Sequence, residues 1–206
     1  AASPACTHDD VARSLVLTNH PARFSRTDAA ATTQGKLRFR GGVRLTSADD
    51  DFGGLSSILV SADGTLFVAV SDEAHWVTGS LEYEDGNLVR AVGGMIAPLR
   101  DLNGLALASK AGDAEGLAST SGNDTGGDLL VSFEGNHRVW RYPFAKDGIR
   151  AVPVNVPTPP EVHGAPYNGG IEGLTLLADN MFVGITERYR NAIGDYRGWI
   201  LWLEAP

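Results

Sequence analysis

The sequence predicts an all-β protein in which one antiparallel unit recurs about three times. The chain contains 25 Gly and 10 Pro among its 206 residues, a composition typical of turn-rich β proteins. Each copy of the unit has the same four parts in the same order. They are a Gly-Leu opening, a turn rich in Gly, Asp or Asn, an apolar strand, and an acidic residue at the end of that strand. The openings are Gly54-Leu55, Gly116-Leu117 and Gly173-Leu174. Units of four short antiparallel strands repeated at this interval are typical of β-propeller blades, so we expect an incomplete propeller with about three blades in this chain.

Composition argues against several classes of protein. Hydrophobic residues make up 43% and charged residues 20% of the chain, which is ordinary for a globular domain. The net charge of −8 argues against binding to nucleic acid or to an anionic membrane. No apolar run reaches the length of a membrane span.

Residues 1–35 are expected to form an N-terminal leader that includes a first strand at residues 14–18. Cys6 is the only cysteine, so a disulfide within this chain is excluded. The small residues at positions 1–5 suit the mature end left by signal-peptide cleavage, which predicts a periplasmic or secreted protein. An arbitrary start of the chain explains these residues equally well.

Residues 36–206 are expected to form the blades. Residues 36–45 alternate polar and apolar, which predicts a strand or hairpin with one solvated face. The first blade covers about residues 52–99. Its expected strands are at residues 55–60, 67–71, 76–83 and 88–92.

The second blade is expected at about residues 113–156, with a hairpin turn at Gly135-Asn136 and a fourth strand at 152–156. The third is expected at 170–206, with its third strand at 199–203 and no fourth strand. Such a blade would expose a strand edge and an open core face. We therefore expect a missing C-terminal segment or a second chain to complete the propeller.

Two further features predict positions within the fold. Residues 98–112 and 157–170 are long, Pro- and Gly-rich stretches between blades, and such loops are often functional and lie on one rim. Trp140, Trp199 and Trp202 lie in strands of alternating pattern and are expected in the core between blades.

Acidic residues recur at strand ends. In an antiparallel pair the start of one strand lies beside the end of the next, so Glu115 and Glu134 should share one end of their blade, as should Glu172 and Glu187. In the first repeat Asp72 keeps its place, while Gly53 stands where the other carboxylate would be, with Asp51 just before it. Converging carboxylates repel one another unless a cation compensates, and calcium prefers several oxygen ligands. The candidate metal ligands are Asp72, Glu115, Glu134, Glu172 and Glu187, with Ca²⁺ as the expected ion.

Basic residues beside these positions are candidates for catalysis. Arg138 and Arg188 could hold phosphate oxygens, and His75 could act as an acid or base. The alternative is that the acidic residues only cap strands or bond to the backbone of a neighbouring blade. The chain lacks a Gly-x-Ser-x-Gly elbow, a phosphate-binding glycine loop, His-Glu-x-x-His and Cys-x-x-Cys, so the common catalytic motifs are absent.

Four segments together resemble the phytase-like proteins, also called the esterase-like activity of phytase family. They are Phe52-Gly-Gly-Leu-Ser-Ser-Ile, Val68-Ala-Val-Ser-Asp-Glu-Ala-His-Trp, Leu130-Val-Ser-Phe-Glu-Gly-Asn-His-Arg-Val-Trp-Arg-Tyr and Ile171-Glu-Gly-Leu. The resemblance covers most of the chain from about residue 36 onward. It implies an exported bacterial β-propeller with phosphoester or ester hydrolysis, and family members of greater length with further blades.

Two functions remain open at this point. The first is a metal-assisted phosphoester or ester hydrolase that acts on a phosphorylated small molecule at the acidic channel mouth. The second is a non-catalytic propeller of the cell envelope that binds a ligand or protein partner at the same mouth.

Overall fold

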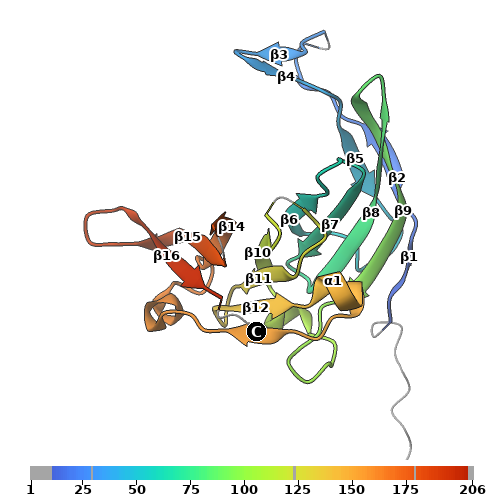
Figure 1. The fold of residues 1–206 in the computed structure, drawn as a ribbon. Coiled ribbons are helices and arrows are strands. Elements are labelled where there is room, and N and C mark those ends of the chain that lie inside the picture. The colour runs from blue at the N-terminus through green and yellow to red at the C-terminus, as the bar shows by residue number, and fades with distance from the viewer. Residues whose placement is uncertain (1–10, 29, 123, 179, 204–206) are drawn as a thin grey trace, which may run out of the picture.

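The computed structural model describes residues 11–28, 30–122, 124–178 and 180–203, so Cys6 and the rest of the first ten residues of the expected leader lie outside the described residues. The described chain is all-β, as expected, with three antiparallel sheets of three to five strands and two further two-stranded sheets. Figure 1 shows the second of the three larger sheets between the other two, and its first strand contacts strands of both neighbours.

The first sheet has the strand order β1-β9-β8-β7-β6. The four strands expected from the sequence are present, although β9 is much longer than expected. The N-terminal strand β1 adds a fifth strand by pairing with β9. The bounds are β1 (Arg13–Leu15), β6 (Leu55–Val60), β7 (Leu66–Ser71), β8 (His75–Glu84) and β9 (Asn87–Pro98).

The second and third sheets follow in chain order. The second, β10-β11-β12-β13, has its expected hairpin turn after β11, and the third, β14-β15-β16, has three strands. The bounds are β10 (Ala114–Ser119), β11 (Leu129–Phe133), β12 (Arg138–Tyr142), β13 (Val154–Val156), β14 (Ile171–Ala178), β15 (Met181–Arg190) and β16 (Tyr196–Trp202). The helical segments between them are short: η2 (Ser109–Ala111), α1 (Phe144–Asp147), η3 (Gly148–Arg150) and η4 (Pro160–Gly164).

The N-terminal region forms two small sheets. Strand β2 (Thr18–Pro21) pairs with β5 (Val43–Thr46), and β3 (Thr33–Gln34) pairs with β4 (Leu37–Arg38). The expectation of a single strand or hairpin over residues 36–45 is therefore wrong. Gly41 adopts a φ of 86° between β4 and β5, a conformation that favours glycine and redirects the chain into a different sheet.

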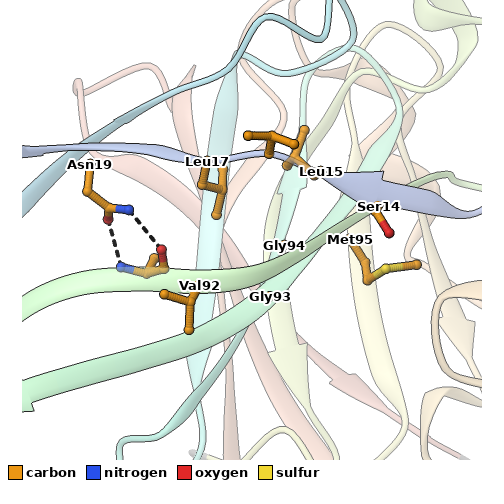
Figure 2. A pocket seen from close by; sticks show the side chains of 10 residues that line it. Ser14, Leu15, Leu17, Asn19, Val92, Gly93, Gly94 and Met95 are labelled. Carbon is orange, nitrogen blue, oxygen red and sulfur yellow. Dashed lines mark hydrogen bonds between the residues drawn. The ribbon is translucent and has the colours of Figure 1, made fainter.

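At the outer edge of the first sheet, the side chain of Asn19 forms hydrogen bonds with the backbone of β9. Asn19 accepts a hydrogen bond from the Ala91 N–H at 2.7 Å and donates one to the Ala91 carbonyl at 2.9 Å, which imitates strand pairing (Figure 2). Between this contact and the β1–β9 pairing lies a cavity of about 460 Å³. Its lining includes Leu15, Leu17, Val92 and Met95 and contains no charged side chain, so it offers no acid–base or metal chemistry.

Two apolar cores fill the spaces between the sheets. The core between the first and second sheets contains Trp76, Phe133 and Tyr142, with Trp140 at its margin. The core between the second and third sheets contains Leu130, Phe182 and Leu201, with Trp199 packed against it. Trp202 is 63% exposed on the opposite face of β16, so it lies outside both of these cores.

Candidate metal and substrate site

The first strands of the three sheets share one irregularity. The pairs Leu55–Ser71, Ala114–Phe133 and Ile171–Thr186 each precede a shift in strand register. These bulges place Ser56, Glu115 and Glu172 at the same position of β6, β10 and β14, where the bulge redirects a side chain. The expectation that Gly53 holds this position in the first repeat is wrong, because the ladder aligns Ser57-Ile58 with Gly116-Leu117 and Gly173-Leu174.

A buried serine joins the bulges of the second and third sheets. Ser132 Oγ accepts a hydrogen bond from the Gly116 N–H at 2.9 Å and donates one to the Ile171 carbonyl at 2.7 Å. A Cβ at Gly116 would lie 2.5 Å from Ser132 Oγ and 3.0 Å from the Glu172 carbonyl oxygen, so a side chain here would displace the bridging serine. Glu115 and Glu172, the neighbours of these bonded groups, are thereby held at adjacent positions.

Asp113, Glu115 and Glu134 form an acidic cluster at this end of the second sheet. One carboxylate oxygen from each lies within 4.8 Å of the other two. The juxtaposition of Glu115 and Glu134 expected from antiparallel geometry is thus observed. Asp113 was not foreseen, although it stands two residues before Glu115, a spacing that often places side chains on one face of a strand.

Burial and mutual repulsion disfavour ionisation of these carboxylates. Burial, with the charges of Glu172, Asp113 and Glu134, raises the pKa of Glu115 to about 8. Burial also raises the pKa of Glu134, against the opposing effect of a hydrogen bond that its Oε1 accepts from the Gly170 N–H at 2.6 Å. Without a cation the cluster therefore retains protons at pH values where isolated carboxyl groups are ionised.

The other acidic residues predicted from the sequence surround this cluster. Burial, followed by the charges of Glu134, Glu187 and Asp113, raises the pKa of Glu172. Burial, followed by the charges of Glu73 and Asp113, raises the pKa of Asp72. The five predicted carboxylates therefore belong to one electrostatic neighbourhood, within which Glu115 and Glu134 share the cluster with Asp113.

His75 lies among a different set of charged groups. Its Nε2 is 3.8 Å from Asp51 Oδ2, and its Nδ1 is buried without a hydrogen-bond partner among the described residues. Arg13 binds both Asp51 and Asp49 beside it. This cluster ties β1 to the segment before β6, and the role of His75 as an acid or base stays a prediction.

Arg138 is engaged by its own surroundings. Its guanidinium lies 4.0 Å from the ring centre of Phe133 and 4.3 Å from that of Trp140. It donates hydrogen bonds to the carbonyls of Ala111 and Asn136. These contacts join η2 to the β11–β12 turn, so Arg138 supports the segment that leads into Asp113.

Arg188 lies beside the predicted carboxylates. It forms a two-point ion pair with Glu187, with Nε 2.8 Å from one carboxylate oxygen and a terminal nitrogen 3.3 Å from the other. Its charge also lowers the cost of ionising Glu172, since it opposes the rise in the pKa of that residue. Its side chain is 65% exposed, so solvent screens this pair.

A polar cavity of about 250 Å³ opens beside the cluster. Its lining residues are Asp72, Glu73, Lys110, Asp113 and Tyr167. Lys110 comes from the stretch 98–112 and Tyr167 from the stretch 157–170, so both long loops contribute to one site as expected. The Tyr167 carbonyl also accepts a hydrogen bond from the Gly135 N–H at 3.2 Å, which ties the second loop to the β11–β12 turn.

The fold and this site define a repeated antiparallel β protein with an acidic, cavity-bearing end. The sequence model of the Phytase-like family, described as esterase-like activity of phytase, matches residues 50–202, and the chain belongs to this family. No curated protein matches the chain. Among the described residues, no helix is both long and apolar enough to cross a membrane.

Proposed function

We propose that the three larger sheets are successive blades of a β-propeller and that its acidic end is the site of a metal-assisted phosphoester hydrolase. Support for the propeller comes from the equivalent bulges of β6, β10 and β14 and from the position of β10 between the other two strands. The outer face of the third sheet is apolar, so we further propose that additional blades, from another segment or a second chain, cover it.

The acidic cluster carries the proposal of a metal. Two oxygens bound to one calcium ion at about 2.4 Å can be at most about 4.8 Å apart. The oxygens of Asp113, Glu115 and Glu134 lie within that limit of one another. An all-carboxylate donor set is the chemistry that a hard cation prefers, and Ca²⁺ is the first candidate.

The surrounding residues would divide the remaining tasks. A bound divalent cation would polarise a phosphoryl oxygen and lower the pKa of a coordinated water. Asp113, Glu115 and Glu134 would hold the ion, while Asp72, Glu172 and Glu187 would contribute further negative charge or outer ligands. The Gly170 N–H fixes the orientation of the Glu134 carboxylate through its hydrogen bond.

A non-catalytic envelope protein that binds a ligand at the same end is the second candidate. The engagement of Arg138 with Phe133, Trp140 and two carbonyls favours it, because a predicted catalytic cation is already bound within the protein. The partners of His75 favour it in the same way, since its ion-pair partner among the described residues is Asp51.

Hydrolysis assays separate the two functions. The protein is assayed with p-nitrophenyl phosphate, phytate and a carboxylic ester, each with Ca²⁺ and with chelator. We expect calcium-dependent release of phosphate that falls at least tenfold in Glu134→Gln, whose amide oxygen can still accept the Gly170 hydrogen bond. Glu84→Gln, at the exposed end of β8, is the matched control and should retain full activity. Absence of turnover on every substrate would leave the binding protein as the function.

We also propose that the protein is exported to the periplasm or secreted. Membership of the Phytase-like family supports this proposal, because the resemblance to that family implies an exported protein. Fractionation of the native cells, with the protein detected by antibody, would test it, and recovery in the cytoplasmic fraction would rule it out.

A further inference from the structure

Recognition of an anionic substrate requires a cation with free hydrogen-bond donors at the cavity. Both arginines proposed for that task have other partners. Arg138 donates to Ala111 and Asn136 and stacks on two rings, and Arg188 is paired with Glu187.

Lys110 meets the requirement. It lines the cavity with Asp72, Glu73, Asp113 and Tyr167. Within the described part of the chain its ammonium group has no carboxylate within 4.0 Å, so its donors are not taken by an ion pair. Lysine is a compact point charge with three rotatable donors, which suits contact with a phosphate oxygen.

The position of Lys110 is fixed by its neighbours. It belongs to η2, and the carbonyl of the next residue, Ala111, accepts a hydrogen bond from Arg138. Two residues later the Asp113 carbonyl accepts a hydrogen bond from the Glu134 N–H at 2.8 Å. The backbone that leads from Lys110 into the acidic cluster is thus held by two hydrogen bonds, and Arg138 acts as a positioning residue for it.

The charges lining the cavity make anion binding conditional on a cation. Asp72, Glu73 and Asp113 oppose a single Lys110, so a phosphate group alone would meet net negative charge. A divalent cation on the Asp113 side would cancel this excess negative charge and leave Lys110 as the lining residue that attracts the anion. A neutral carboxylic ester would gain nothing from the ammonium group.

We propose that Lys110 is the specificity-determining residue of this site and selects a phosphomonoester over a neutral ester by direct contact with the phosphate. This inference rests on the proposed metal site, since the anion is expected to bind only after the cation.

Inorganic phosphate and Ca²⁺ are the probes, and calorimetry with the 206-residue protein measures both affinities. In Lys110→Met we expect phosphate, at saturating Ca²⁺, to bind about ten- to a hundredfold more weakly, the effect of losing one charge-assisted hydrogen bond. The same variant should bind Ca²⁺ at least as tightly as the wild type, because a neighbouring positive charge has been removed. A variant that merely disturbed the fold would lose both affinities. Lys146→Met, in exposed α1, should leave both unchanged.

The outcomes separate this inference from the proposed hydrolase. Phosphate binding that depends on Ca²⁺ and Lys110 in a protein without turnover would support the inference and remove the enzyme. Calcium-dependent turnover with equal phosphate affinity in wild type and Lys110→Met would support the enzyme and overturn the inference. Absence of phosphate binding to the calcium-loaded wild type would overturn it as well.

Discussion

Glu115 shows most clearly how individual residues establish the character of the site. Its carboxyl group is partly buried and faces three other carboxylates, which raises its pKa to about 8 from an ordinary value of 4.5. Between these two values the folded, metal-free protein keeps a proton that the unfolded chain releases. The stabilising contribution of Glu115 is therefore complete below about pH 4.5 and is lost as the pH rises toward 8.

This shift predicts a pH dependence that calcium removes. In chelator, the melting temperature of the wild type relative to Glu115→Gln should fall by several degrees between pH 5 and pH 8.5. With Ca²⁺ bound the carboxylate has a cationic partner, so the relative decrease should disappear. Differential scanning calorimetry of both proteins at the two pH values provides the measurement. A wild type that gains stability relative to Glu115→Gln as the pH rises in chelator would contradict the assigned burial and repulsion.

At the scale of elements, adjacent sheets are joined by polar bonds as well as by apolar packing. Ser132 on β11 bonds to Gly116 on β10 and to Ile171 on β14, and its side chain is buried. Glu115 and Glu172 lie directly beside these two backbone groups. The geometry of the acidic site therefore depends on a serine that is not one of its acidic residues.

Ser132→Ala should weaken both the fold and the site. It leaves a buried N–H and a buried carbonyl without partners, which costs about 1–3 kcal/mol for each group that water cannot reach. Calcium affinity should fall, because Glu115 and Glu172 lose their common anchor. Ser119→Ala is the control: Ser119 is equally buried, but its hydroxyl bonds to Ser121 at the other end of β10. Denaturant unfolding and calcium calorimetry distinguish them, and equal calcium affinities would show that Ser132 does not organise the site.

At the scale of the whole molecule, the third sheet has a covered face and an uncovered one. The strand register makes Val183 and Ile185 of the third sheet equivalent to Val68 and Val70 of the first. In the second sheet the equivalent residues are Leu130 and Ser132. In those two sheets the next sheet covers this face. In the third sheet Ile185 and Ile200 are each 51% exposed and Trp202 is 63% exposed on it.

This face predicts self-association of the 206-residue protein or binding of a further sheet. We expect the protein to bind a hydrophobic dye and to form oligomers as its concentration rises, because large exposed apolar patches favour association. The double substitution Ile200→Thr and Trp202→Ser should reduce both effects. Leu37→Ser, which removes a 73% exposed leucine from the small β3–β4 sheet, should not. Light scattering would contradict the proposed additional blades if the wild type stays monomeric and binds no dye.

Several features followed from local sequence. The alternation of apolar residues and the turn sequences predicted both ends of β6 correctly. They predicted the ends of β7 and β8 to within one residue. Antiparallel geometry predicted that Glu115 and Glu134 meet, because the start of one strand lies beside the end of the next. These predictions depend only on residues close together in the chain.

The features that the sequence predicted wrongly depend on contacts between residues that are far apart in the chain. A strand shifted by three residues gives a similar Gly-Leu pattern, so only the ladder showed that Ser56, and not Gly53, corresponds to Glu115 and Glu172. Likewise, only packing showed that Arg138 stacks on Phe133 and Trp140 while Lys110 lines the cavity.

The repeat and the acidic strand ends of this protein follow from the sequence, because side-chain alternation and hairpin geometry act over a few residues. The membership of the acidic cluster, the cation that faces the cavity and the uncovered face of the third sheet come from the tertiary structure. Each of these depends on which side chains from separate sheets and loops pair their charges, form hydrogen bonds and pack their apolar surfaces together. Local sequence does not contain that information.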